Sequence, residues 1–340
     1  MAAETAKTEP TATGSMDIKK WAAWIGVVGI WFLPLIWIEP TTYLVLTVAG
    51  LAMGMLIFLI AVGLTLIFGL MDVLNMAHGA FFAFGAYIGF SILTVLDSFG
   101  WVEYGTLGQN MGSLFVALIV SAMGGAILGI IVEKVIVRWV YGDHLKQILI
   151  TMGVSFVLVE MIKIIWGLND EVVIVPMAFQ GSFDIFDIII NKFRVVAILI
   201  GVSVFVLLQL SLKKTKLGII VRAGVENREN VQATGYNINR IFTGVFAAGS
   251  ALAAVGGTMM SIFKESIHPA MGDDNFIFAL MVVIIGGMGS VAGSFLGAIM
   301  VGLAFNYVAF LMPKLALGVN FMIMAIILLI RPTGLMGKTD

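Results

Sequence analysis

Two polar side chains, Asn75 and His78, lie in the stretch LNMAHGAF (residues 74–81), whose other residues are almost all apolar. Burying a polar group costs free energy unless it is hydrogen-bonded. Asn75 can cap a helix that we predict from about Ala77. His78 can bond to freed backbone groups or to a neighbouring helix, and so hold a gate. The alternative is that the two residues contact a solute directly.

Catalytic chemistry is not indicated anywhere in the chain. Three histidines and no cysteine are scattered along it, so we predict neither a metal site nor thiol chemistry. The Gly-Lys-Ser/Thr motif that cradles phosphate is missing, so we do not expect this chain to hydrolyse ATP itself. The formal net charge of −1 does not indicate a nucleic-acid partner. We therefore expect no catalytic residue and no cofactor.

The elements that carry these residues belong to a membrane protein. The chain has 340 residues, of which 60% are hydrophobic and 11% are charged, whereas soluble domains have about 25% charged residues. Its apolar runs are continuous rather than alternating, which favours helices over a barrel. We predict an all-α, polytopic bundle of about ten membrane-crossing segments with Gly-interrupted helices in each half. The segments are 21–38, 43–69, 79–96, 112–137, 148–167, 193–212, 241–262, 276–288, 290–311 and 315–331.

Basic residues predict the orientation of these segments, because cytoplasmic loops are enriched in Lys and Arg. With both termini in the cytoplasm and ten crossings, most of the 19 basic residues fall on the cytoplasmic side. Residues 1–20 then form a disordered cytoplasmic tail, and 21–338 form one transmembrane domain. In this topology Asn75 and His78 lie near the cytoplasmic turn of the hairpin 43–96, away from the bilayer midplane.

Glycines interrupt an apolar segment twice, once in each half of the chain. The segments are IFGLMDVLNMAHGAFFAFGAYIG (67–89) and IIGGMGSVAGSFLGAIMVG (284–302). Paired interruptions of this kind indicate a translocation path in transporters, although glycines also allow helices simply to pack closely. The predicted path and gate residues are Asn75, His78, Gly79, Gly85, Gly286, Gly287, Gly289, Ser290 and Gly293.

Two loops are candidates for contact with partners. Residues 213–240 are polar, and we predict a short amphipathic surface helix that ends near Gly235. This loop could anchor at lipid headgroups or fit a groove of a cytosolic protein. Residues 167–187 form an acidic outer loop, which either docks an external partner or is a solvated connector.

Charged residues inside the predicted spans have structural explanations. Glu160 and Lys163 share a helix face and can neutralise each other. Glu133 lies near the cytoplasmic end of its span, where it can extend to the interface. No other acid lies deep in a predicted span, which argues against a stand-alone ion-coupled carrier.

Four stretches together resemble the branched-chain amino-acid permeases of ABC importers, a family with relatives for urea, short amides and aromatic or aliphatic acids. They are GLTLIFGLMDVLNMAHGAFFAFGAYIGF (63–90), VRAGVENRENVQATGYNINRIFTGVFAAGSALAAVGG (221–257), GGMGSVAGSFLGAIMVG (286–302) and RPTGLMGK (331–338). The resemblance runs from about residue 43 to 338. Many relatives have Glu after the His-Gly pair, where this chain has Ala80.

The resemblance implies a permease of the bacterial inner membrane that works with a second homologous permease, two cytosolic ATPases and an external solute-binding protein. It also implies that loop 213–240 contacts an ATPase. The candidate coupling residues are Arg222, Glu226, Arg228, Glu229 and Gly235.

The function expected from these observations is import of branched-chain or other hydrophobic amino acids, by alternating access that the partner ATPases drive. The first alternative is the same class of importer for urea, short amides or carboxylic acids. The others are a stand-alone channel or ion-coupled carrier and, less directly, a membrane scaffold or enzyme without a transport role.

Overall fold

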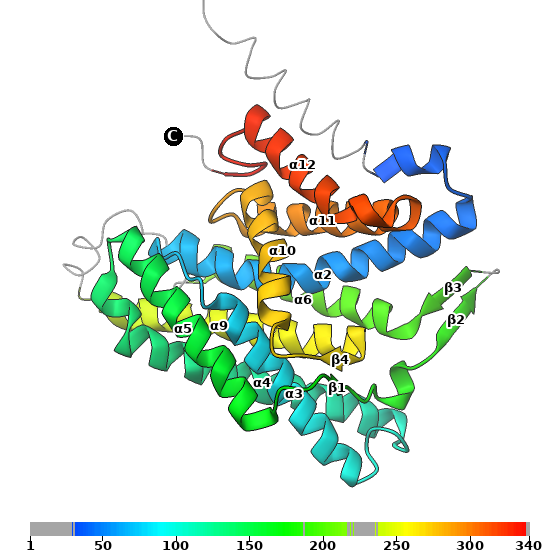
Figure 1. The fold of residues 1–340 in the computed structure, drawn as a ribbon, viewed down its shortest axis with the longest axis horizontal. Coiled ribbons are helices and arrows are strands. Elements are labelled where there is room, and N and C mark those ends of the chain that lie inside the picture. Colours follow the sequence, from blue (N-terminus) through cyan, green and yellow to red (C-terminus); the bar gives the residue numbers. More distant parts are fainter. Residues whose placement is uncertain are drawn as a thin grey trace, which may run out of the picture.

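The computed structural model describes residues 29, 31–185, 188–215, 218, 220, 235 and 237–337. This part of the chain is a bundle of long helices (Figure 1), which confirms the predicted all-α polytopic class. The helices are α2 (Pro40–Met71), α3 (His78–Ser98), α4 (Leu107–Val135), α5 (His144–Trp166), α6 (Lys192–Lys214), α9 (Ile238–Lys264), α10 (Met271–Gly286), α11 (Val291–Leu311) and α12 (Ala316–Ile330). Four short 3₁₀ turns are η1 (Leu33–Ile36), η2 (Val137–Val140), η3 (Met177–Phe179) and η4 (Pro313–Leu315).

In the described part of the chain, eight helices are long and apolar enough to cross a membrane, if η4 and α12 are counted together as one helix. The exception is α10, which has 16 residues and is shorter than the roughly 20 residues that a crossing needs. It corresponds to the predicted segment 276–288. The predicted tail 1–20 and most of the predicted span 21–38 lie outside the described residues.

The bundle has inner and outer helices. Most of α2 and α9 is buried, whereas most of α5, α6 and α12 is not. The outer helices expose large apolar side chains, among them Ile164 and Leu329. A lipid environment solvates such side chains, so the exposed apolar faces fit a protein embedded in a bilayer.

Helix α9 packs closely on α3 because small residues line the contact. A Cβ atom on Gly85 would clash with the backbone of Ala254, and one on Gly257 would clash with that of Phe82. The hydroxyl of Thr258 donates to the carbonyl of Gly85 at 2.8 Å. Such close approach with an interhelical hydrogen bond is typical of packing in membranes.

Two small antiparallel strand pairs mark one end of the bundle, which we call the hairpin end. β2 (Ser182–Ile185) pairs with β3 (Ile188–Asn191), and β1 (Glu171–Val172) pairs with β4 (Ser266–Ile267). At the opposite end, which we call the loop end, α4 and α6 finish and α5 and α9 begin (Figure 1).

Candidate functional site

The chain folds back into the bundle after α2. Asp72 ends this helix in the left-handed conformation (φ 55°), with its N–H bonded to the carbonyl of Phe68 at 2.8 Å. Helix α3 then begins at His78, whose Nε2–H donates to the carbonyl of Ile60 at 2.9 Å. Ile60 precedes the end of α2 by about three helical turns. The start of α3 therefore lies beside the middle of α2.

The expected position of Asn75 and His78 near the cytoplasmic turn is therefore wrong. A Cβ on Gly63 would lie 3.0 Å from the ring of His78 and would also touch Gly249, which is at the middle of α9. His78 thus lies halfway along two long helices. The prediction failed because it treated residues 72–77 as a surface turn, whereas they lead the chain back along α2.

Two side chains of α5 satisfy the backbone of the fold-back segment 72–77. Gln147 Oε1 accepts from the N–H of Leu74 at 3.2 Å, and Thr151 Oγ1 accepts from the N–H of Met76 at 3.0 Å. Both side chains are fully buried. The sequence interpretation missed them, although two polar residues four apart in an apolar helix share one face and could have indicated such a role.

Asn75 closes the turn that leads into α3. Its Oδ1 accepts from the N–H of Ala77 at 3.1 Å, and Ala77 is the residue at which the helix is capped. Asn75 and His78 are both fully buried. Among the residues that the structure describes, neither Asn75 Nδ2 nor His78 Nδ1 has a hydrogen-bond partner. Unpartnered buried polar atoms are rare and call for an explanation.

Helix α10 begins where α3 begins. A Cβ on Gly79 would lie 2.8 Å from the carbonyl oxygen of Gly272, so only glycine allows this backbone contact. The chain reaches Gly272 from α9 through residues 265–270, a second fold-back that also starts at a left-handed residue, Glu265 (φ 56°). The N-termini of α3 and α10 therefore meet inside the bundle, where each contributes a partial positive charge.

The second group of predicted glycines lies at the loop end, in the turn from α10 to α11. Gly287 and Gly289 have φ of 99° and 82°, and Ser290 Oγ accepts from the N–H of Gly293 at 3.1 Å to cap α11. Gly286 packs on Gly293. The structure thus brings these five residues together but does not place them beside His78.

The C-terminal segment and α2 cover this turn. The N–H groups of Leu335 and Met336 donate to the carbonyls of Ile285 and Gly286, each at 2.9 Å. A Cβ on Gly289 would lie 3.0 Å from the Cα of Gly69. Gly85, by contrast, lies within α3 at its contact with α9.

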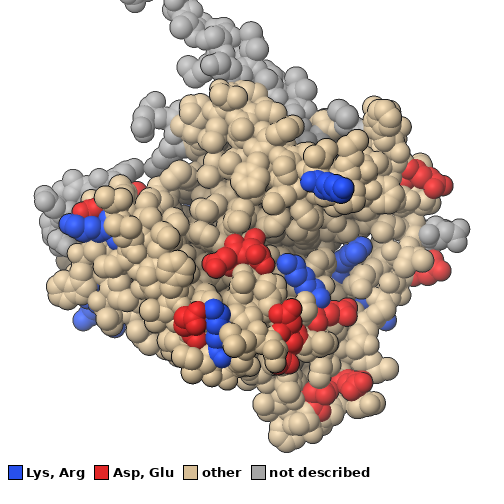
Figure 2. All heavy atoms as spheres, in the orientation of Figure 1, with Lys and Arg blue, Asp and Glu red and all other residues tan. Residues whose placement is uncertain are grey.

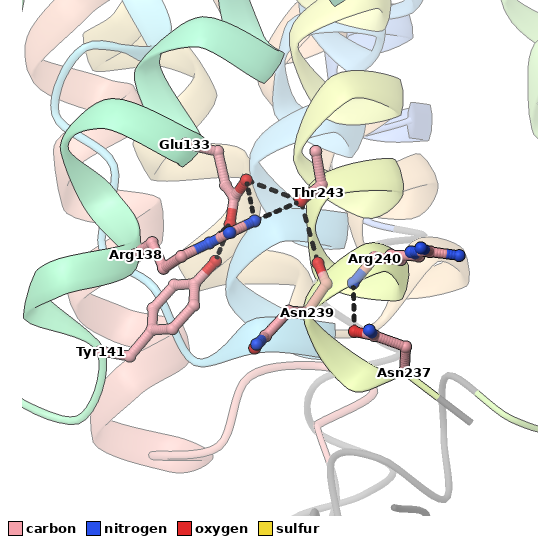
Figure 3. Close-up of polar contacts among 7 residues, drawn as sticks. All are labelled: Glu133, Arg138, Tyr141, Asn237, Asn239, Arg240 and Thr243. Carbon is pink, nitrogen blue, oxygen red and sulfur yellow. Dashed lines mark hydrogen bonds and ion pairs between the residues drawn. The ribbon is translucent and has the colours of Figure 1, made fainter. Parts of the chain in front are cut away.

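A buried carboxylate joins α4 to the start of α9 (Figure 3). Glu133 is fully buried and accepts from Tyr141 Oη at 2.7 Å and from Thr243 Oγ1 at 2.7 Å. Arg138 lies 3.4 Å from the carboxylate and donates to the Thr243 hydroxyl at 3.1 Å. We call these four residues the carboxylate clamp. The expectation that Glu133 extends to the interface is wrong, because α9 covers it.

The carboxylate clamp lies where the polar loop re-enters the bundle. Asn237 caps α9 with a hydrogen bond from the N–H of Arg240 at 3.2 Å, and Gly235 has φ of 88°. Thr243 lies in the second turn of the same helix. The other predicted coupling residues, Arg222, Glu226, Arg228 and Glu229, lie outside the described residues.

Charged side chains gather across the middle of the face formed by α5 and α10 (Figure 2). Lys163 pairs with Glu160 at 2.6 Å, as the sequence predicted, and His268 lies 3.0 Å from Asp274. A groove of about 450 Å³ is lined by Glu160, Lys163, Asp170, His268 and Asp273 together with apolar residues. No cluster of three or more His, Cys, Asp or Glu suited to a metal ion occurs among the residues with described positions.

The comparisons with known proteins identify relatives over most of the chain. A family model described as "Branched-chain amino acid transport system / permease component" matches residues 46–329. The permease LivH of a high-affinity branched-chain amino acid transport system in Escherichia coli is 27% identical over 298 residues, which cover 86% of this chain and 94% of LivH. BraD of Pseudomonas aeruginosa, named for the same kind of system, is 27% identical over 305 residues, or 88% of this chain and 97% of BraD.

A more distant relative is named for another solute. The ribose import permease RbsC of Haemophilus influenzae is 26% identical over 197 residues, which cover 56% of this chain and 58% of RbsC. The comparison with solved structures gives no match.

We predict that Thr151→Val destabilises the protein by about 1–3 kcal/mol, because it leaves the buried N–H of Met76 without its partner. The midpoint of thermal unfolding in detergent measures the effect. Thr94→Val is the matched control, since the exposed Thr94 hydroxyl bonds only to its own helix. Equal midpoints for the two variants would contradict the role of Thr151.

Proposed function

Because this chain belongs to the family of branched-chain amino acid transport system permeases, we propose that it is the membrane subunit of an ATP-driven importer for branched-chain or other hydrophobic amino acids. The observation that carries the proposal is the family match over residues 46–329, which includes both fold-back segments. The mechanism is alternating access. Relative motion of α3 and α10 opens the path at the middle of the bundle.

The proposed topology places the loop end in the cytoplasm of a bacterium and the hairpin end outside. Basic residues concentrated at the loop end support this orientation. They include Lys134, Arg138, Lys146, Lys213, Lys214, Arg240 and Arg331. The segment after Arg331 continues along the turn from α10 to α11, which puts the C-terminus in the cytoplasm, and we propose the same side for the N-terminus.

The proposed gate is the junction of α3 and α10. Gly79 and Gly272 are in backbone contact there, so this arrangement is closed. Separation of the two helices would expose Asn75 Nδ2 and His78 Nδ1 to water or solute, and the cost of leaving them unpartnered would disappear. The glycines at 286–293 then serve as the hinge of α10, and Gly85 keeps α3 close to α9.

The proposed path runs along the face of α5 and α10. Its charged groups gather on this face (Figure 2), from the last two turns of α5 to the start of α10, and charged groups of membrane proteins usually face a water-filled cavity. A water-filled path between two permease subunits would solvate these groups. Similarity to a second permease, LivM of Salmonella typhimurium (26% identical over 321 residues), supports pairing with a homologous subunit.

The proposed coupling route starts at loop 213–240, where one of the two cytosolic ATPases binds. The loop leads through Gly235 into α9, and the carboxylate clamp fixes the first turns of α9 to α4. Helix α9 in turn packs closely on α3. Motion imposed on the loop would therefore reach the gate through buried contacts between helices. An external solute-binding protein would deliver the solute at the hairpin end.

One observation favours a second candidate solute. The similarity to RbsC, although it covers 56% of this chain, shows that related permeases are named for a sugar rather than an amino acid. A test of the solute by uptake into proteoliposomes should therefore include ribose and urea as competing solutes.

We predict that the full chain co-purifies with two ATPase subunits and a second permease, and that the complex imports leucine into proteoliposomes only with ATP and a solute-binding protein. Radiolabelled uptake measures transport, with ribose and urea as competing solutes. Uptake by this chain alone, driven by an ion gradient, would refute the importer proposal. Selective uptake of ribose or urea would show that the importer carries that solute instead of a branched-chain amino acid.

We predict that His78→Ala lowers the rate of uptake by about tenfold, because the ring no longer holds the start of α3 against the carbonyl of Ile60, which is left without this partner. Docking of the solute-binding protein, measured by surface binding, should not change. The control is His144→Ala, since that histidine lies partly exposed at the loop end. If the His78 variant takes up solute at the wild-type rate, His78 contributes only to packing.

We predict that Thr243→Val uncouples transport, because the Glu133 carboxylate loses one hydrogen bond and the first turns of α9 lose a polar attachment to α4. A hydrogen bond to a charged group contributes about 1.5–3 kcal/mol, so solute imported per ATP hydrolysed should fall about tenfold while ATP hydrolysis continues. Thr243→Ser keeps the hydroxyl and should restore coupling. A parallel fall in both activities would show that the clamp only stabilises the fold.

A further inference from the structure

A cavity of about 660 Å³ lies at the hairpin end of the bundle, away from the proposed gate. Its walls come from the segment after β1, from η3, from the start of α6 and from the end of α9. Small-molecule sites typically have volumes between about 300 and 1,000 Å³. The cavity is therefore large enough for an amino acid.

Apolar side chains form much of the wall. They are Val173, Ile174, Val175, Phe179, Phe193, Ile262 and Phe263. Phe179 and Phe193 also contact each other, with ring centroids 6.5 Å apart. These side chains can accommodate the aliphatic or aromatic body of a ligand, and the polar residues Gln180 and Asn191 line the same cavity.

Two opposite charges line the same cavity, Arg194 and Glu265. Among the described residues, neither side chain forms an ion pair, with the other or with any third group. An Arg guanidinium is well suited to bind a carboxylate through two parallel hydrogen bonds. Arg194 is half-buried and Glu265 is exposed, so both groups are available to a ligand that carries the complementary charges.

The backbone of Glu265 ends α9 in the left-handed conformation. Its φ of 56° lies in the left-handed region, which glycine or asparagine adopts more readily than glutamate. The N–H of Val173 donates to the carbonyl of Glu265 at 3.0 Å, so pairing of β1 with β4 holds this conformation. Strained residues of this kind cluster at functional sites.

We propose that this cavity binds a zwitterionic α-amino acid with an apolar side chain. Arg194 binds the carboxylate, Glu265 binds the ammonium group, and the apolar wall takes the side chain. A simple anion would leave Glu265 unpaired, and a simple cation would leave Arg194 unpaired. The inference rests on the proposed function and deepens it, because it gives this chain its own solute site on the side where solute arrives.

The test measures ligand binding to the complete permease–ATPase complex in nanodiscs, without the solute-binding protein, by calorimetry. Three ligands test the contacts of the carboxylate and the ammonium group one at a time. Leucine has both groups, leucinamide lacks the carboxylate, and 4-methylpentanoate lacks the ammonium group. The wild-type complex should bind leucine at least tenfold more tightly than either analogue.

Each charge variant should remove one preference and keep the other. Arg194→Gln should bind leucine and leucinamide alike but still prefer leucine over 4-methylpentanoate, and Glu265→Gln should do the reverse. Glu265→Gly suits the left-handed backbone and should match Glu265→Gln, which separates the charge from the fold. Lys192→Gln removes a nearby positive charge that does not line the cavity, and should retain both preferences.

Two results would overturn the inference. One is a wild-type complex that does not bind leucine without the solute-binding protein. The other is a set of variants that weaken all three ligands equally, as a general loss of structure would. Neither result affects the proposed function, which stands or falls on ATP-dependent uptake by the wild-type complex with its solute-binding protein.

Discussion

Every backbone N–H and C=O group in the bundle interior must find a partner inside the protein, because lipid offers none. This constraint explains why a chain that folds back at residues 72–77 needs α5 beside it. Gln147 and Thr151 take the hydrogen bonds that a continuous helix would have made internally. Two side chains from a different helix thus offset the free-energy cost of interrupting the helical backbone between α2 and α3. Any motion that opens the junction must also supply these N–H groups with water or new partners.

The class of fold was predictable because long apolar runs in a chain with few charges allow only one kind of structure. Helix positions followed from the same apolar runs. The pairing of Glu160 with Lys163 was also predictable, since residues three apart share a helix face. These features depend on residues that are close together in the sequence, so one sequence is enough to predict them.

Features that depend on distant partners were not predictable. The six residues after α2 separate two apolar helices as a surface turn would, and the bond from His78 to Ile60 shows that they run inward. The second fold-back at 265–270 was missed because Glu265 and His268 suggest a surface loop, whereas Gly272 meets Gly79 inside the bundle. Glu133 was misplaced because its partner Thr243 lies 110 residues away in the chain. Sequence spacing alone cannot reveal that α9 covers it.

The two left-handed residues, Asp72 and Glu265, are the only non-glycine residues with positive φ in the described part of the chain. Each is acidic, ends a long inner helix, and precedes a helix that starts at the junction of α3 and α10. Asp72 lies at the loop end and Glu265 near the hairpin end, so the two units run in opposite senses through the bundle. Inverted units of this kind provide no preferred direction by themselves. The direction of net transport would then be imposed from outside the symmetric core, by whatever binds at either end.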